Sequence, residues 1–170
     1  ALNAALTGHL VLSTLHTNDA ATALPRLLDL GVEPFLAASS VNVVIAQRLV
    51  RRICDQCTVR VALSEAQRET LRRLLHQRSK LAERLGKEAP VARSEGCAAC
   101  DGSGYRGRVG IYEVLTVDDT LRPLIVRKAS AAELKAVGLE NGMTTMLEDG
   151  VEKVLGGVTT VEEILSAAQE

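Results

Sequence analysis

Four cysteines are the residues of this 170-residue chain with the clearest chemical spacing. They fall in two pairs, Cys54 with Cys57 and Cys97 with Cys100, and two residues separate the members of each pair. Two such turns present four thiolates to one tetrahedral zinc ion, and the length between them is tolerable because the entropy of loop closure rises slowly with length. Four protein ligands leave no position for water, so the sequence predicts a structural zinc site.

Two other uses of the cysteines are open. Two local disulfides would need an oxidising compartment, and we expect a protein that is not exported, because the sequence opens without a charged and then apolar leader. Redox pairs of the thioredoxin type follow a strand in a suitable context, which neither pair does. Zinc is therefore the favoured interpretation.

A second candidate site follows an apolar run near the start of the chain. Residues 10–15 are too short for a typical helix and lack polar alternation, a pattern typical of a parallel strand that is buried on both faces. His16, Thr17 and Asn18 come directly after this run. Open α/β sheets bind ligands at the carboxyl ends of their strands, where helix N-termini favour anions. The sequence therefore predicts a phosphate contact at this turn.

His9 lies at the other end of the predicted strand. Seven residue steps of about 3.3 Å separate it from His16 by roughly 23 Å, so the two cannot share a metal. We expect a structural or relay role for His9. A single histidine at a strand end, such as His16, is as often a satisfied polar residue as a functional one. The chain has no Gly-x-x-x-x-Gly-Lys-Ser/Thr loop and no convincing Ser/His/Asp or Cys/His set.

Further elements must position these two sites. The patterns predict a helix capped by Thr22 and an almost wholly apolar helix over 35–50. They also predict a helical stripe over 71–85, after a capping box of Ser64 and Gln67, and a strand over 105–115. The tail is predicted to be helical, with capping boxes that begin at Ser130, Thr145 and Thr160. Such a mixture predicts an α/β fold.

Composition excludes several classes of protein. The formal net charge is −1 and aromatic residues make up 2 % of the chain, so neither a basic field nor stacking rings favour a nucleic-acid surface. Hydrophobic residues make up 46 % and can form a core, but no apolar run approaches the length of a membrane span.

Motifs along most of the chain add a resemblance. They occupy residues 7–19, 26–35, 46–54, 96–100, 104–115, 149–150 and 157–165. Together they resemble the histidine box and the following motifs of the secretion and type IV pilus ATPases, the family of type II secretion system protein E. The resemblance covers the chain except the segment between the cysteine pairs.

This resemblance implies the carboxyl-terminal portion of a RecA-like P-loop NTPase core, with residues 1–53 as the last piece of that core, residues 54–104 as a tetracysteine zinc subdomain, and residues 105–170 as a strand and a helical module. It implies a homo-hexamer that hydrolyses ATP with Mg²⁺ in the cytoplasm, peripheral to the inner membrane, and that works with platform proteins of the secretion or pilus machine. It also implies that the four cysteines bind zinc, that His16 faces the terminal phosphate, and that His9 is the earlier histidine of the same box.

One departure from the family limits these expectations. The phosphate-binding loop, the acidic boxes and the arginine fingers of the family all lie upstream of the first residue here, so we expect a fragment that binds ATP weakly and does not hydrolyse it alone. The alternative function is a zinc-binding chaperone or adaptor module, because residues 97–104 are similar to the Cys-x-x-Cys-x-Gly-x-Gly repeat of DnaJ-type chaperones. That repeat occurs once here, whereas such chaperones need several copies.

Overall fold

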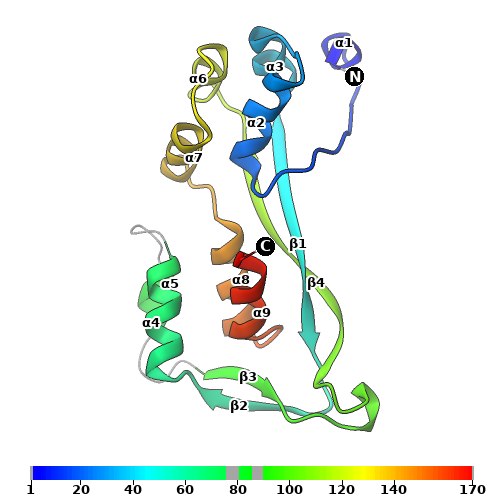
Figure 1. Cartoon of the computed structure of the whole chain (residues 1–170), viewed down its shortest axis with the longest axis vertical. Helices are drawn as coiled ribbons and strands as arrows, with labels where there is room; N and C mark the ends of the chain where they lie inside the picture. The colour runs from blue at the N-terminus through cyan, green and yellow to red at the C-terminus, as the bar shows by residue number, and fades with distance from the viewer. Residues whose placement is uncertain (1, 76–80, 86–89, 170) are drawn as a thin grey trace. The chain divides into compact units, whose positions relative to one another are not determined.

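The chain is mixed α/β, and the computed structural model describes residues 2–75, 81–85 and 90–169 (Figure 1). The helices are α1 Leu2–Leu6, α2 Ala20–Asp29, α3 Pro34–Ser40, α4 Glu65–Leu74, α5 Leu81–Arg84, the 3-10 turn η1 Ala98–Cys100, α6 Arg122–Val126, α7 Ala131–Glu140, α8 Met146–Leu155 and α9 Val161–Gln169. The strands are β1 Val43–Ile53, β2 Thr58–Ala62, β3 Pro90–Ser94 and β4 Tyr105–Thr116. Strand β1 pairs with β4, and β2 pairs with β3.

The contacts divide the chain into two compact units. Unit 1 comprises residues 1–46 and 113–145, and unit 2 comprises residues 47–112 and 146–170. None of the helices in the described ranges is long and apolar enough to cross a membrane.

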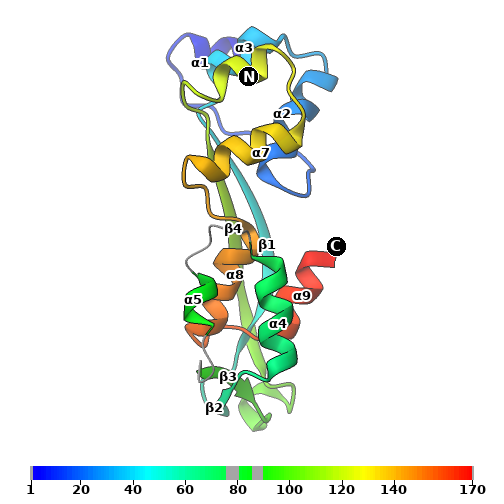
Figure 2. The same cartoon turned by 90° about the vertical axis from the view of Figure 1, so that its left-hand side faces the viewer.

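Unit 1 is built from short helices on the ends of β1 and β4. Helix α2 packs against α7, as Figure 2 shows, and α3 packs against α6. Its core contains Leu24, Leu115, Leu121, Ile125 and Leu134, each at most 1 % exposed. Helix α7 approaches β4 closely at Gly138, where a Cβ atom would lie 2.7 Å from Leu115 Cδ1.

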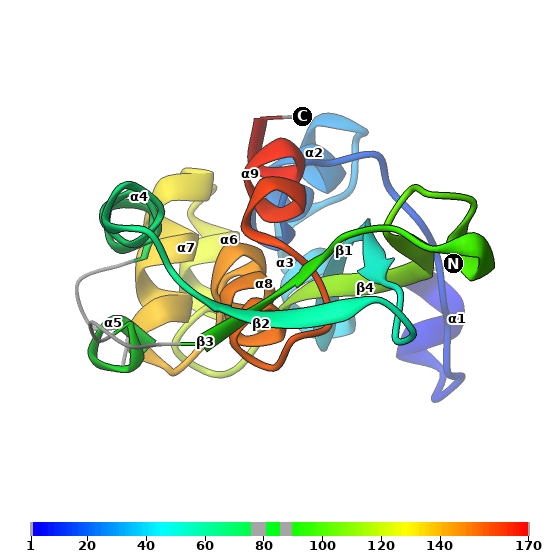
Figure 3. The same ribbon diagram turned by 90° about the horizontal axis from the view of Figure 1, so that it is seen from below.

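Unit 2 holds the antiparallel pair of β2 and β3, which run side by side in Figure 3 with Thr58 opposite Ser94 and Ala62 opposite Pro90. Helix α8 packs against α9, with Gly150 facing Ile164. The capping box of Ser64 and Gln67 is confirmed at the start of α4. Leu71, Leu75, Leu81 and Leu85 of the predicted stripe are buried, whereas residues 76–80 lie outside the described residues.

The prediction of one helix over residues 35–50 is wrong. Helix α3 ends at Ser40 and strand β1 begins at Val43. Consecutive β-branched residues at 43–45 lose side-chain freedom in a helix and pack well on a pleated sheet. Burial then alternates, because Ala46 and Val50 are buried while Ile45 and Leu49 are exposed.

The prediction of a buried strand over residues 10–15 is also wrong for this chain. The segment has no regular structure, and Leu10 and Leu12 are 90 % and 87 % exposed. A strand needs a neighbour for its N–H and C=O groups, and the two sheets of the described residues pair β1 with β4 and β2 with β3. The apolar run therefore stays open to water.

The predicted capping box at Ser130 is confirmed, and at Thr160 the hydroxyl accepts the Glu163 N–H at 3.4 Å. The box at Thr145 stays a prediction. The strand predicted over 105–115 is confirmed as β4. The cap of α2 is Asp19, not Thr22, because the Asp19 carboxylate accepts the Thr22 N–H at 2.8 Å. Aspartate is a strong N-cap, and with Asp19 as the cap the helix begins at Ala20.

Candidate metal centre and histidine segment

Two tight turns carry the four cysteines in unit 2. The first turn leaves β1 at Ile53 and closes with the Cys57 N–H donating to the Cys54 carbonyl oxygen at 3.4 Å. The second turn contains η1 and closes with the Gly102 N–H donating to the Cys97 carbonyl oxygen at 2.9 Å. A main-chain hydrogen bond of 3.0 Å from Cys54 to the Gly104 carbonyl oxygen joins the two turns.

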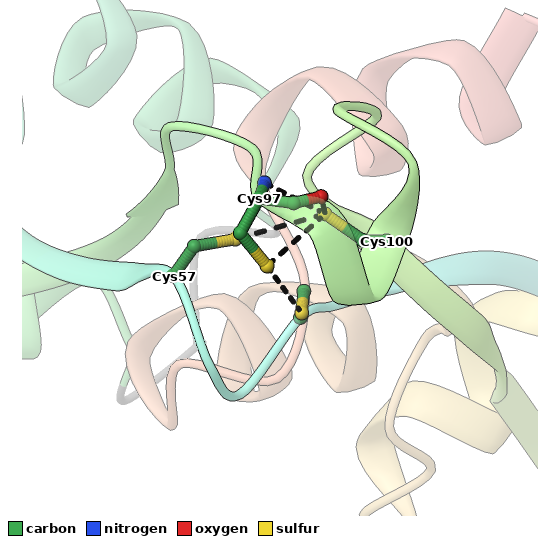
Figure 4. Close-up of side chains that lie close together, drawn as sticks. Cys57, Cys97 and Cys100 are labelled. Carbon is green, nitrogen blue, oxygen red and sulfur yellow. Dashed lines mark hydrogen bonds between the residues drawn. The ribbon is translucent and has the colours of Figure 1, made fainter.

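The four sulfur atoms converge on one point. The Sγ atoms of Cys54 and Cys97 are 3.9 Å apart, and those of Cys57 and Cys100 are 3.8 Å apart. All four lie within 4.8 Å of one another, and Figure 4 shows the sulfurs of Cys57, Cys97 and Cys100 turned toward each other. A tetrahedron with Zn–S bonds of about 2.3 Å has S···S edges of about 3.8 Å, so the cluster fits zinc.

The same distances argue against local disulfides. All four cysteines are free, and the sulfurs of Cys97 and Cys100 lie 3.8 Å apart, far beyond the bond length of about 2.05 Å. The set of four thiolates also leaves no open position, which makes the centre structural in character.

Main-chain donors set the charge of the second pair. The Cys97 N–H donates to Cys100 Sγ at 3.2 Å and the Gly104 N–H at 3.3 Å, and these bonds lower the pKa of Cys100 to about 6. Loss of solvation and the neighbouring sulfurs raise the pKa of Cys97 to about 11. Within the second pair, Cys100 is therefore the thiol that ionises at the lower pH.

Two contacts to these sulfurs were missed from the sequence. Ser94 Oγ lies 3.0 Å from Cys57 Sγ, and a Cys57 thiolate would accept a hydrogen bond from the Ser94 hydroxyl. No pattern pointed to Ser94, which comes from the end of β3. The glycine-rich sequence after the second pair was a signal that could have indicated the Gly104 N–H, because main-chain donors can approach a ligand closely at glycine.

The strands that lead into the centre are held by α9 and by the segment before it. The Ile53 N–H donates to the Val158 carbonyl oxygen at 2.9 Å. The Arg51 guanidinium lies 4.1 Å from the centre of the Tyr105 ring and donates two hydrogen bonds to Glu163 Oε1 at 2.9 and 2.6 Å. Burial raises the pKa of Glu163, but the hydrogen bonds from Arg51 outweigh burial and lower it overall, so the pair stays ionised at neutral pH.

The candidate phosphate residues lie in unit 1 on an open segment. His16 and Asn18 are exposed, and half-buried Thr17 donates from Oγ1 to the Asp19 carbonyl oxygen at 3.1 Å. His9 is exposed and its Nδ1 lies 3.1 Å from Thr7 Oγ1. In the described ranges, no interaction of the structure joins His9 to His16. The turn reaches the N-terminus of α2, as predicted, but without a strand before it.

Comparisons with known proteins point to one family. A family model described as "Type II/IV secretion system protein" matches residues 1–166. The chain is 48 % identical over its whole length to the type IV pilus assembly ATPase PilB of Thermus thermophilus, of which it covers 18 %. It is 44 % identical to the type II secretion system protein E of Pseudomonas aeruginosa, and all of the chain aligns with 32 % of that relative.

A second protein of Pseudomonas aeruginosa, the type II secretion system protein HxcR, is 42 % identical over the whole chain, which covers 30 % of it. The chain thus spans about a fifth to a third of the length of these relatives. The matched range includes the four cysteines and residues 9–18, which we call the histidine segment.

Proposed function

Because the chain belongs to the type II/IV secretion system protein family, we propose that it forms part of an ATPase that drives type II protein secretion or type IV pilus assembly. The observation that carries the proposal is the family match over residues 1–166, together with relatives that are named as pilus assembly ATPases and secretion proteins. The identity of 42–48 % over the full chain supports a shared role.

We assign the three segments as the resemblance implied. Residues 1–53 are the last piece of a RecA-like core, residues 54–104 the zinc subdomain, and residues 105–170 a strand with a helical module. The working unit is a homo-hexamer, peripheral to the inner membrane on its cytoplasmic side, that acts with platform proteins of the machine.

In this proposal the metal centre is a cross-link. Cys54, Cys57, Cys97 and Cys100 hold zinc, which supplies four strong bonds and no reaction. Closing a loop of this size stabilises the folded chain by about 4 kcal/mol in the loop-entropy treatment of cross-links. The centre thereby ties the end of β1 to the turn that precedes β4.

The histidine segment is the chain's contribution to the ATP site. His16, Thr17 and Asn18 contact the terminal phosphate of ATP bound with Mg²⁺. His9 takes a relay or structural part. The 170 residues contain no phosphate-binding loop, so they bind ATP weakly on their own.

The test uses the natural-length protein isolated from its source. We expect ATP turnover, and we expect His16→Ala to lower kcat at least tenfold because one phosphate contact is lost in the transition state. Ser13→Ala, an exposed position in the same segment, is the matched control and should leave kcat unchanged. Absence of turnover by the unmodified protein would overturn the ATPase proposal, and unchanged kcat in His16→Ala would overturn the role of the histidine.

The isolated 170-residue chain gives an independent check. Calorimetry with ATP and Mg²⁺ should detect no saturable binding in the micromolar range. Such binding would show that the phosphate site is complete without a phosphate-binding loop, contrary to the proposal.

A further inference from the structure

A buried carboxylate in unit 1 has no role in either candidate site. The Glu113 side chain on β4 is 2 % exposed, and its Oε1 accepts the Ala20 N–H at 3.1 Å. Burying a carboxylate is costly unless it is hydrogen-bonded or paired. The N–H groups of the first helical turn have no partner inside the helix, so Glu113 and the start of α2 satisfy each other.

A lysine joins this carboxylate to the helix cap. Lys135 Nζ, on α7, lies 3.2 Å from Asp19 Oδ2 and 3.8 Å from Glu113 Oε2. Asp19 uses its other oxygen to accept the Thr22 N–H. Burial raises the pKa of Asp19, but the hydrogen bonds from Thr22 and Lys135 outweigh burial and lower it overall. We call Asp19, Glu113 and Lys135 the anchor cluster.

The anchor cluster ends where the candidate phosphate turn begins. Asp19 follows Asn18 directly, and Thr17 Oγ1 donates to the Asp19 carbonyl oxygen at 3.1 Å. Apart from half-buried Val11, residues 9–15 before this turn are exposed, and none of them lies in a helix or strand. The turn is therefore fixed to the protein at its carboxyl side, through contacts that come from β4 and α7.

We propose that Glu113 and Lys135 are positioning residues for nucleotide hydrolysis: they hold the turn of His16, Thr17 and Asn18 at the angle and depth that the terminal phosphate requires. The inference rests on the proposed function, because it gives the anchored turn its task. Neither side chain touches nucleotide. Glu113 acts through the Ala20 N–H, and Lys135 acts through the Asp19 carboxylate. A small shift of a phosphate contact lowers the rate of reaction more than it weakens ground-state binding.

The experiment uses the natural-length protein with Glu113→Ala and Lys135→Met, the latter retaining an unbranched apolar stem without the charge. We expect kcat for ATP to fall five- to tenfold while KM stays within twofold of the unmodified protein. Amide hydrogen exchange at residues 17–22 should speed up in both variants. Lys135→Arg, which keeps a cation within reach of both carboxylates, should restore most of the rate.

Arg51→Met is the matched control. Arg51 likewise pairs with a carboxylate, that of Glu163 at 2.6 Å, and both residues belong to unit 2. A general loss of stability would affect the control as well, whereas a positioning role predicts normal kcat there. Circular dichroism melts ensure that rates are compared where every variant is folded.

The results separate this inference from the proposed function. If His16→Ala is impaired and both anchor variants turn over normally, the positioning role is overturned and the proposed function stands. If His16→Ala is normal, the proposed phosphate role fails, and hydrogen exchange alone decides: faster exchange at residues 17–22 supports the anchoring, and unchanged exchange overturns it. Faster exchange with unchanged kcat, where His16 does matter, also overturns the positioning role.

Discussion

The two candidate sites differ in how far this chain completes them. The four cysteine sulfurs lie within 4.8 Å of one another, a ready-made tetrahedral set. The histidine segment is exposed, and its known anchor is on one side only, at Asp19. One site is assembled by its own turns, whereas His16 and Asn18 of the other are exposed on a segment outside regular structure.

The difference teaches what each site needs from the polypeptide. Each cysteine pair sits in a local turn, and one main-chain bond between Cys54 and Gly104 joins the turns. The proposed phosphate site would draw on a Gly-x-x-x-x-Gly-Lys-Ser/Thr loop, a pattern that the 170 residues do not contain. Local ligand sets can be complete in a part of a protein, whereas a site shared between distant segments cannot.

The largest expected effect comes from removing one metal ligand. Cys97→Ser should reduce bound zinc from one ion per chain to almost none and cost about 4 kcal/mol of stability, because the cross-link between the two turns is lost. Plasma mass spectrometry of the purified chain measures the zinc, and urea unfolding measures the stability. Ala98→Ser introduces the same residue at an exposed neighbouring position and should keep full zinc content. Full zinc content in Cys97→Ser would sink the assignment of the ligand set.

A pair of glycines sharpens the comparison. Gly96 and Gly8 both have positive φ, +86° and +88°, but a Cβ at Gly96 would lie 2.5 Å from the Gly102 carbonyl oxygen, whereas at Gly8 it would meet nothing within 4 Å. Gly96→Ala combines backbone strain with a steric clash and should cost about 3 kcal/mol. Gly8→Ala carries the backbone strain alone and should cost about 1 kcal/mol. Equal costs in urea unfolding would contradict the contrast between a packed turn and an open one.

The smallest effect is expected in the apolar run. Leu12 is 87 % exposed, so Leu12→Ser should change the free energy of unfolding of this chain by less than about 0.5 kcal/mol. Leu24→Ser, at a side chain that is 1 % exposed in α2, is the control and should cost at least about 3 kcal/mol. If residues 10–15 become a buried strand in the natural-length protein, Leu12→Ser should cost several kcal/mol there. A large cost in the 170-residue chain would mean that the segment is already packed.

Sequence reasoning succeeded where the determinants are local. The cysteine spacing predicted the cluster, and Ser64 and Ser130 predicted helix starts, because ligand geometry and capping depend on residues a few positions apart. The strand at 105–115 also followed from its own residues. The three-segment division and the roles of His9, His16, Thr17 and Asn18 stay predictions.

Sequence reasoning failed where tertiary neighbours decide. The run at 43–50 is apolar enough for a buried helix, and its β-branched residues became decisive only with β4 as a partner. The run at 10–15 has the composition of a strand but no neighbour in the described residues. Ser94 and Glu113 are distant in sequence from the groups they serve, so no spacing rule could find them.

The chain passes between its two compact units three times, at residues 46–47, 112–113 and 145–146. No single cut of the gene therefore yields either unit, since both are made of two separated stretches. Recombination that exchanged one unit between relatives would need matched crossovers at several of these junctions. We expect the two units to be inherited together.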